Sequence, residues 1–460
     1  MDQNSQGRGS CVGVRASASR PSFTARALSN SGSRLGCRTR RNSQRQRPSR
    51  THEAIKQARD APQHLLERRG EGKVPAGDVH PGKQQRRRAR AVLLGANQVI
   101  YLNSVTLTWF RDVNIPEQWG FLRNQVTPFV LPTPDGEQLH AWHVLPLGLY
   151  QQHEGRLTRE PAGLAHDISQ RTCFKLLKDD PDSLLVLYFH GAAGTLGSGW
   201  RPPSYRAMSA ASPGRIHTIA IDYRGFGSSS GRPSEAGLLT DALALANFAL
   251  REAGIPPSRI VLFAQSLGTA VAISLAHHFA TQPDTILFAG LVLVAPFGNV
   301  ELLTASYRVA GTIPLLSPLA RFPRLMAFFN TFVRDKWPST DRLAALVRHV
   351  EHLPPGGRDA ARYHVTVIHA EDDYDIPWSH SENLFWHAVN ATSPVGTTRA
   401  ELDRHRADAG QLLGHAGRVV DWRAPRGHMR EIILRYGLHD RIMAYPVVSL
   451  AVLRAFQSKA

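Results

Sequence analysis

Serine, histidine and acidic side chains recur where apolar runs of the chain end, and these residue types can carry nucleophilic catalysis. The segment Ala264-Gln265-Ser266-Leu267-Gly268 lies between the apolar run 259–264 and a helix-like pattern. It approximates G-x-S-x-G, in which a serine stands on a sharp turn between a strand and a helix. Ala264 replaces the first glycine but still meets the size limit of a tight turn. We therefore predict that Ser266 is a nucleophile, with the N–H of Leu267 directed the same way.

A glycine-rich segment, His190-Gly191-Ala192-Ala193-Gly194, follows the apolar run 184–189. Glycine permits close approach of the backbone to a substrate. The N–H of Ala192 could pair with that of Leu267 as an oxyanion hole, the donor pair that acyl transfer requires. An ordinary strand-to-loop turn is the alternative. Phosphate binding by a P-loop is excluded, because no G-K-[ST] follows.

The carboxylate of a catalytic triad is expected in the acidic cluster that follows the run 364–370. A triad needs a carboxylate that orients its histidine and stabilises the charged form of the ring. The cluster comprises Glu371, Asp372, Asp373 and Asp375, and we favour Asp373 over Asp372. A metal site is disfavoured, because no H-x-x-x-H pair adjoins the cluster and the acids lack calcium-loop spacing.

Two histidines compete for the general base, which must follow the acid in the chain order expected for this arrangement. If Met429–Tyr436 is the last strand, His439 lies in the loop at its end. If Val419–Trp422 is the last strand instead, His428 becomes the base. We favour His439 and leave His428 open.

The apolar runs that carry these residues predict a doubly wound, mostly parallel sheet. Continuous apolar runs typical of buried strands alternate with helical patterns, and function collects at the carboxyl ends of such strands. The predicted strands are 184–189, 216–221, 259–264, 287–295 and 364–370, preceded by short strands at 125–131 and 138–145, and the predicted helices are 236–253, 269–279, 343–353 and 447–456. Asp222 and Arg224, after the second of these runs, are interpreted as structural.

The basic charge of the chain is concentrated at its N-terminus. Of the formal net charge of +18, residues 1–90 hold 21 Lys and Arg against 6 Asp and Glu, whereas residues 91–460 hold 34 against 31. We predict a disordered Arg/Ser-rich tail over residues 1–95, whose composition also fits a mitochondrial transit peptide. The nearly neutral body needs no nucleic-acid partner. Its single cysteine, Cys173, excludes a disulfide framework there.

Two apolar segments bear on lipid binding. Polar residues interrupt 91–110, so we predict an interfacial helix or a helix packed on the body rather than a membrane span. The segment 300–333 is rich in Leu, Phe and Pro, and we predict a helical lid at about 300–345 that covers Ser266 and accepts acyl chains.

Four of the segments that follow apolar runs are Phe189-His-Gly-Ala-Ala-Gly194, Asp222-Tyr-Arg-Gly-Phe-Gly227, Gln265-Ser-Leu-Gly-Thr269 and His369-Ala-Glu-Asp-Asp373. Together they resemble serine hydrolases of the α/β-hydrolase superfamily and, closer still, the branch of α/β-hydrolase domain-containing protein twelve, which comprises monoacylglycerol and lysophosphatidylserine lipases. Two further segments resemble the fungal members of that branch: Asn124–Tyr150 and Tyr436-Gly-Leu-His-Asp-Arg-Ile-Met-Ala-Tyr-Pro446.

The resemblance covers about residues 98–460 and implies an α/β-hydrolase fold with Ser266 as nucleophile, Asp373 as acid and His439 as base. It implies a lipid ester substrate, no cofactor, and association with the endoplasmic reticulum or another endomembrane. A cytoplasmic or mitochondrial location is the alternative. Ala264 departs from the family's elbow glycine, and Ala192 stands where such proteins often carry Asn. A thioesterase, a peptidase or a non-catalytic scaffold of the same fold remain alternative functions.

Overall fold

The structure, a computed structural model, describes residues 100–306, 333–354 and 362–457, together with several positions between 308 and 331. The expected tail, residues 1–95, lies outside the described residues. Part of the expected lid at about 300–345, between 307 and 332, also lies outside them.

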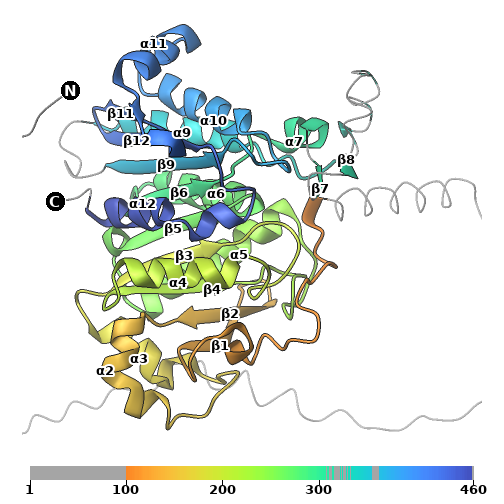
Figure 1. The fold of residues 1–460 in the computed structure, drawn as a ribbon, viewed down its shortest axis with the longest axis vertical. Coiled ribbons are helices and arrows are strands. Elements are labelled where there is room, and N and C mark those ends of the chain that lie inside the picture. Colours follow the sequence, from red (N-terminus) through yellow and green to blue (C-terminus); the bar gives the residue numbers. More distant parts are fainter. Residues whose placement is uncertain are drawn as a thin grey trace, which may run out of the picture. The chain divides into compact units, whose positions relative to one another are not determined.

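Ten strands form one mixed sheet in the order β1-β2-β4-β3-β5-β6-β9-β12-β11-β10 (Figure 1). They are β1 (Val126–Pro132), β2 (Gln138–Val144), β3 (Leu184–Phe189), β4 (Ile216–Ile221), β5 (Ile260–Gln265), β6 (Gly290–Val294), β9 (Tyr363–Ala370), β10 (Gln411–Leu412), β11 (Gly417–Ala424) and β12 (Gly427–Leu434). The strands from β4 to β12 in this order pair in parallel, and the flanking pairs are antiparallel. The carboxyl ends of the parallel strands therefore meet at one edge of the sheet.

Helices cover both faces of the sheet and bury an apolar core against each. They are α2 (Leu147–Leu157), α3 (Thr172–Asp179), α4 (Arg201–Ala211), α5 (Glu235–Asn247), α6 (Leu267–Ala280), α7 (Val300–Ser306), α9 (Ser339–Glu351), α10 (Ser379–Asn390), α11 (Arg399–Ala409) and α12 (Pro446–Gln457). One core cluster includes side chains of α5, α6, α9 and α10, and the other includes side chains of α4 and α12. This arrangement confirms the predicted doubly wound sheet.

Most predicted elements lie where the apolar runs indicated. The runs 184–189 and 216–221 coincide with β3 and β4, and both candidate last strands exist, as β11 and β12. β12 lies parallel to β9, whereas β11 forms an antiparallel pair with β12 nearer the sheet edge. The helix predicted over 236–253 corresponds to α5, which ends at Asn247, and the π-helical turn Phe248–Glu252 that continues it.

The helix considered for residues 91–110 is absent from the described part of that segment. Helical geometry is assigned to Ile100 and Tyr101, and turns and irregular backbone follow. Leu102, Leu107 and Phe110 have positive φ angles of 48°, 54° and 61°, which a right-handed helix cannot contain. None of the described helices combines the length and the hydropathy that a transmembrane span requires.

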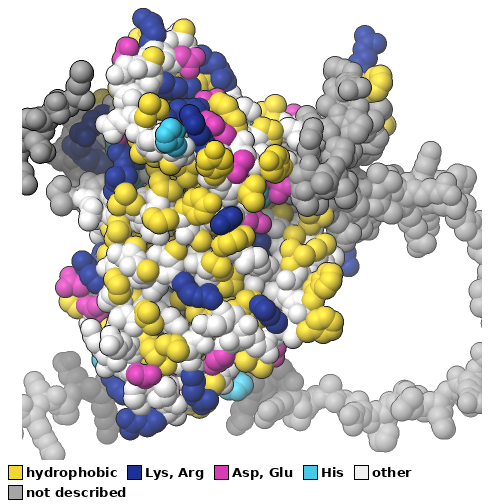
Figure 2. All heavy atoms as spheres, viewed as in Figure 1, with side chains coloured by type: hydrophobic (Ala, Val, Ile, Leu, Met, Phe, Trp, Pro, Cys, Tyr) yellow, Lys and Arg dark blue, Asp and Glu magenta, His cyan; other side chains and the backbone are white. Residues whose placement is uncertain are grey.

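The described part of the expected lid includes residues 333–345, where Val333 and Trp337 are buried and α9 begins. It also includes α7, a short antiparallel pair formed by β7 (Arg308–Val309) and β8 (Ile313–Pro314), and a few exposed side chains. Leu302, Phe322 and Phe328 are among those exposed side chains. On the face that carries α4 and α12, hydrophobic side chains are interspersed with charges of both signs (Figure 2).

Candidate active site

Ser266 stands on the turn between β5 and α6, with φ 53° and ψ −121°. A non-glycine residue with such a backbone stores about 1–3 kcal/mol of strain and persists only where its surroundings enforce it. The turn is the strained strand-to-helix elbow that the sequence predicts for a nucleophile. Leu267 is the first residue of α6, so its N–H has no acceptor within the helix.

The elbow is tight because α6 begins directly against the end of β3. A Cβ atom on Gly268 would lie 2.1 Å from the carbonyl oxygen of Phe189 and 2.8 Å from that of His190. Ala264, by contrast, is fully buried in β5 opposite Phe189. The structure thus accommodates a methyl group two residues before Ser266 but leaves no space for one two residues after it.

His439 and Asp373 form a close pair at the same edge of the sheet. Asp373 follows β9, and His439 follows β12. The Nδ1 atom of His439 lies 2.8 Å from Oδ2 of Asp373, so Nδ1 carries the hydrogen and Nε2 is left as an acceptor. The side chain of Asp373 is fully buried, and that of His439 is 11% exposed.

The pKa values of this pair follow from burial and mutual attraction. Burial lowers the pKa of His439, but the charge of Asp373 and their hydrogen bond outweigh it and raise that pKa to about 9. Burial likewise raises the pKa of Asp373, but attraction to His439 and hydrogen bonds from His439 and His369 hold that pKa well below its usual range. Asp373 is therefore a carboxylate, as orientation of a base requires.

A second histidine, His369, contacts the same carboxylate. Its Nε2 atom lies 3.0 Å from Oδ2 of Asp373 and 3.0 Å from the carbonyl oxygen of Ile376. Both partners only accept, so Nε2 carries the hydrogen, and Nδ1, 2.6 Å from Oγ of Ser381, accepts from that hydroxyl. The N–H groups of Asp375 and Ile376 donate to the other carboxylate oxygen at 2.9 Å each.

The loop that carries His439 is joined to the Ser266 elbow and to the Asp373 segment. The side-chain amide of Gln265 donates to the carbonyl oxygen of His439 at 3.3 Å and to Oδ1 of Asp440 at 3.0 Å. Asp372 accepts from the N–H of Leu438 at 2.8 Å. Asp372 thus holds the loop, while Asp373 faces the ring. Among the described residues, no hydrogen bond joins the Ser266 hydroxyl to the ring of His439.

The glycine-rich loop after β3 lies beside Ser266. A Cβ atom on Gly191 would approach Cβ of Ser266 to 3.1 Å. The N–H groups of Ala193 and Gly194 donate to carbonyl oxygens of Tyr101 and Val105 at 2.9 and 2.5 Å. Within the described part of the chain, the N–H groups of Ala192 and Leu267 have no acceptor.

The other residues singled out in the sequence pair with side chains outside the Asp373–His439 pair. His428, at the start of β12, pairs with Asp421 at 2.8 Å and lies opposite His364 of β9, at the amino end of that strand. Arg224 pairs with Asp135 and Asp241. The buried side chain of Asp222 lies with Oδ1 3.2 Å from Nε2 of His190. No group of acidic, His and Cys side chains suited to a metal ion is present among the described residues.

The sequence pattern did not reveal two buried residues beside these groups, His369 and Arg201. His369 is the seventh residue of β9, and only its place four residues before Asp373 hints at a contact. Arg201 is the first residue of α4, and its contacts with the loop after β3 follow from the fold alone.

The chain is similar in sequence to several known proteins. The chain is 27% identical over 302 residues to the lysophosphatidylserine lipase ABHD12 of Danio rerio, which covers 65% of this chain and 68% of that protein. The same protein of Xenopus tropicalis is 27% identical, with coverages of 64% and 66%. Protein ABHD12B of Homo sapiens is 25% identical, with coverages of 64% and 70%. These relatives confirm the resemblance indicated by the motifs, and the chain spans about two thirds of their length.

The chain also aligns with solved structures. An alpha-beta hydrolase from Vibrio vulnificus aligns with a TM-score of 0.42 and 16% identity, covering 69% of this chain and 85% of that one. Residues 185–443 match the model of the alpha/beta hydrolase family. Because that match spans more than half of the sequence and includes Ser266, Asp373 and His439, the chain belongs to the alpha/beta hydrolase family.

Proposed function

We propose that the protein is a serine hydrolase that cleaves carboxylic esters of lipids, with Ser266 as nucleophile, His439 as general base and Asp373 as the carboxylate that orients the base. The observation that carries the proposal is the buried Asp373–His439 pair, joined through Gln265 to a serine on a strained elbow. A scaffold that only binds a partner has no need of this combination.

The groups suggest an acyl-enzyme mechanism. Oγ of Ser266 attacks the ester carbonyl carbon while its proton passes to Nε2 of His439. The bond to the alcohol then breaks, and the alcohol leaves with that proton. Water attacks the acyl-serine, its proton passes through His439 back to Ser266, and the carboxylic acid is released. The N–H groups of Ala192 and Leu267 are proposed to bind the oxyanion of both tetrahedral intermediates. This chemistry requires no metal or organic cofactor.

The substrate is proposed to be a monoacylglycerol or a lysophospholipid. Relatives over about two thirds of this chain are named lysophosphatidylserine lipases. The apolar composition of 300–333 suits the acyl chain of a lipid better than a polar substrate group. A thioesterase or a peptidase of the same fold would use the same nucleophile, so the choice of substrates in the assay separates these functions.

We also propose that the protein works at a lipid surface. Trp109 and Phe110, with exposed fractions of 72% and 102%, follow the segment that binds the glycine-rich loop. Tyr374 and Tyr436, exposed by 66% and 65%, adjoin Asp373 and the loop of His439. Exposed aromatic side chains are typical of interfacial binding. If this is correct, Trp109→Ser with Phe110→Ser should weaken co-sedimentation with lipid vesicles but leave hydrolysis of a soluble ester intact.

The test of the proposed function is release of acid from four substrates: a monoacylglycerol, lysophosphatidylserine, an acyl thioester and a peptide amide. We expect the wild-type protein to cleave at least one of the two lipid esters, Ser266→Ala to be inactive, and the exposed control Ser228→Ala to be unchanged. Preference for the thioester or the amide would reassign the substrate class. Activity that survives in Ser266→Ala would refute the nucleophile.

A further inference from the structure

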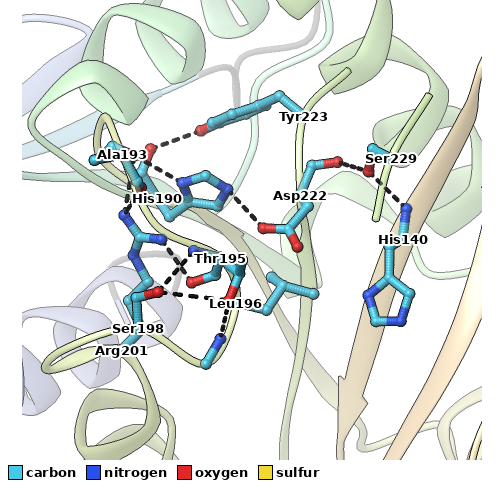
Figure 3. A network of polar contacts seen from close by, with 12 residues as sticks. His140, His190, Ala193, Thr195, Leu196, Ser198, Arg201, Asp222, Tyr223 and Ser229 are labelled. Atoms are coloured by element: carbon cyan, nitrogen blue, oxygen red, sulfur yellow. Dashed lines mark hydrogen bonds and ion pairs between the residues drawn. The ribbon is translucent and has the colours of Figure 1, made fainter. Parts of the chain in front are cut away.

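Arg201 projects from the first turn of α4 into the glycine-rich loop that follows β3 (Figure 3). Its guanidinium donates to the carbonyl oxygens of Gly191, Ala192 and Ala193 at 3.0, 3.3 and 2.8 Å. It also donates to that of Thr195 at 2.6 Å. A single side chain therefore binds nearly every carbonyl group of the loop from residue 191 to residue 195.

Arg201 is itself buried, with 7% of its surface exposed. Burial of a cation is costly unless charge and hydrogen bonds compensate for it. Among the described residues, no carboxylate lies within ion-pair distance of Arg201, so the dipoles of the loop carbonyls provide the compensation. A planar guanidinium with several fixed N–H donors can satisfy such a ring of carbonyls, and the compact ammonium of lysine cannot.

These contacts determine which way the loop amides point. In a trans peptide the C=O and the following N–H are directed oppositely. Because the carbonyl of Gly191 faces Arg201, the N–H of Ala192 faces away from it. The Nδ1 atom of His190, 2.7 Å from the same carbonyl, fixes that peptide further. The next two N–H groups donate to Tyr101 and Val105, which leaves the N–H of Ala192 without an acceptor among the described residues.

We propose that Arg201 is a positioning residue that fixes the Gly191–Ala192 peptide with its N–H toward the reacting carbonyl and thereby assembles the oxyanion hole. This role rests on the proposed function. A peptide flip at this position would turn a carbonyl oxygen toward the developing negative charge, and it would break the bonds of that carbonyl to Arg201 and His190. The guanidinium charge behind the peptide also polarises its N–H toward the oxyanion.

The test compares Arg201→Lys with Arg406→Lys, the same change at a half-buried arginine of α11 that binds Glu431 of β12. Each protein is assayed on a soluble ester and inhibited with two lipid analogues. An alkyl trifluoromethyl ketone forms a tetrahedral oxyanion with the nucleophile, whereas an alkyl glycerol ether forms none.

For Arg201→Lys we expect kcat to fall by roughly a hundredfold, as on loss of an oxyanion donor, with little change in KM. Affinity for the ketone should fall in proportion, and affinity for the ether should not. Arg406→Lys should change neither kcat nor the ratio of the inhibition constants of the ketone and the ether.

Inhibition constants do not depend on the amount of folded enzyme. The ratio of the constants for the ketone and the ether therefore remains decisive if Arg201→Lys is only partly folded. If it does not fold, Arg201→Gln is tested in the same way. Equal losses of affinity for both inhibitors, or no loss, would overturn the role of Arg201 in an active enzyme. A wild-type protein that neither cleaves the ester nor binds the ketone would instead overturn the proposed function, and this role with it.

Discussion

The ring of His439 donates to the carboxylate of Asp373 at 2.8 Å, although 66 positions of sequence separate the two residues. They meet because β9 and β12 are adjacent parallel strands, and each residue follows the carboxyl end of its strand. The contact leaves Nε2 of the ring free to accept a proton.

The pH dependence of hydrolysis should report this contact. Only the neutral ring can act as a base, and Asp373 raises the pKa of His439 to about 9 despite its burial. We therefore expect kcat/KM to rise with pH on an acid limb whose midpoint lies above the ordinary histidine value of about 6.5. In Asp373→Asn the attraction is lost and burial remains, so the midpoint should move to lower pH while the plateau falls. A midpoint that does not move would contradict the pairing.

A pair of one-methyl substitutions should separate the two ends of the elbow. In Gly268→Ala the new methyl would meet backbone oxygens of Phe189 and His190, which cannot yield as a flexible side chain can. We expect a lower melting temperature and nearly complete loss of activity. In Ala264→Gly the only costs are a buried methyl and a freer backbone, about 1 kcal/mol, and activity should persist. Differential scanning calorimetry with an ester assay checks both, and a fully active Gly268→Ala would count against the elbow.

His369 should act on the reaction through Asp373. In His369→Phe the carboxylate loses one of its donors, which should lower the free energy of unfolding by about 1–3 kcal/mol. The carboxylate of Asp373 would then interact with the ring of His439 alone and attract its charged form more strongly. We therefore expect kcat to fall and the acid limb of kcat/KM to move to higher pH. His364→Phe, at the other end of the same strand, should cost stability without moving the limb. Indistinguishable pH profiles for these two variants would assign His369 a purely structural role.

A buried histidine pair away from the site should limit stability in acid. Nε2 of His143 on β2 lies 3.0 Å from Nδ1 of His217 on β4. Burial lowers the pKa of His143 to about 3 and that of His217 well below its usual value. Because the unfolded chain takes up these protons near pH 6.5 and the folded chain does not, stability should fall as pH drops below about 6.5.

Each such histidine adds up to about 1.4 kcal/mol per pH unit to the slope of the free energy of unfolding against pH. His143→Gln removes one of them and should therefore lose less stability than the wild type between about pH 7 and pH 5 in urea unfolding. The exposed control His415→Gln should behave as the wild type. Equal acid sensitivity in all three proteins would show that the pair does not govern this loss.

Much of the site could be predicted because its residues follow buried strands, whose apolar runs are plain in the sequence. The runs before His190 and Ser266 place these residues at the edge where β3 and β5 end. The sequence favoured Met429–Tyr436 over Val419–Trp422 as the last strand but left both open, and their pairing distinguishes them. β12, not β11, lies beside β9, and the loop after it carries His439 next to Asp373.

Other features depend on contacts that no local pattern records. The apolar residues between 100 and 110 indicated a helix, but backbone turns at Leu102, Leu107 and Phe110 replace it, and contacts with the glycine-rich loop hold the segment. Arg201 binds carbonyl oxygens, which every residue possesses, so its position carries no signal in the sequence. The sequence alone only favoured Asp373 over Asp372, and the fold shows how they differ: Asp372 accepts from the N–H of Leu438, whereas Asp373 contacts the ring of His439.

Covalent labelling with a fluorophosphonate probe tests the central claim most directly, because the reagent reacts with a serine only when that serine is activated. The proteins compared would be the wild type, Ser266→Ala, the exposed control Ser228→Ala, and a chain that lacks residues 1–90. We expect labelling of the wild type, of the control and of the shortened chain, mapped to Ser266 by mass spectrometry, and none in Ser266→Ala. Folded wild-type protein that is not labelled, or labelling that persists in Ser266→Ala, would contradict the account.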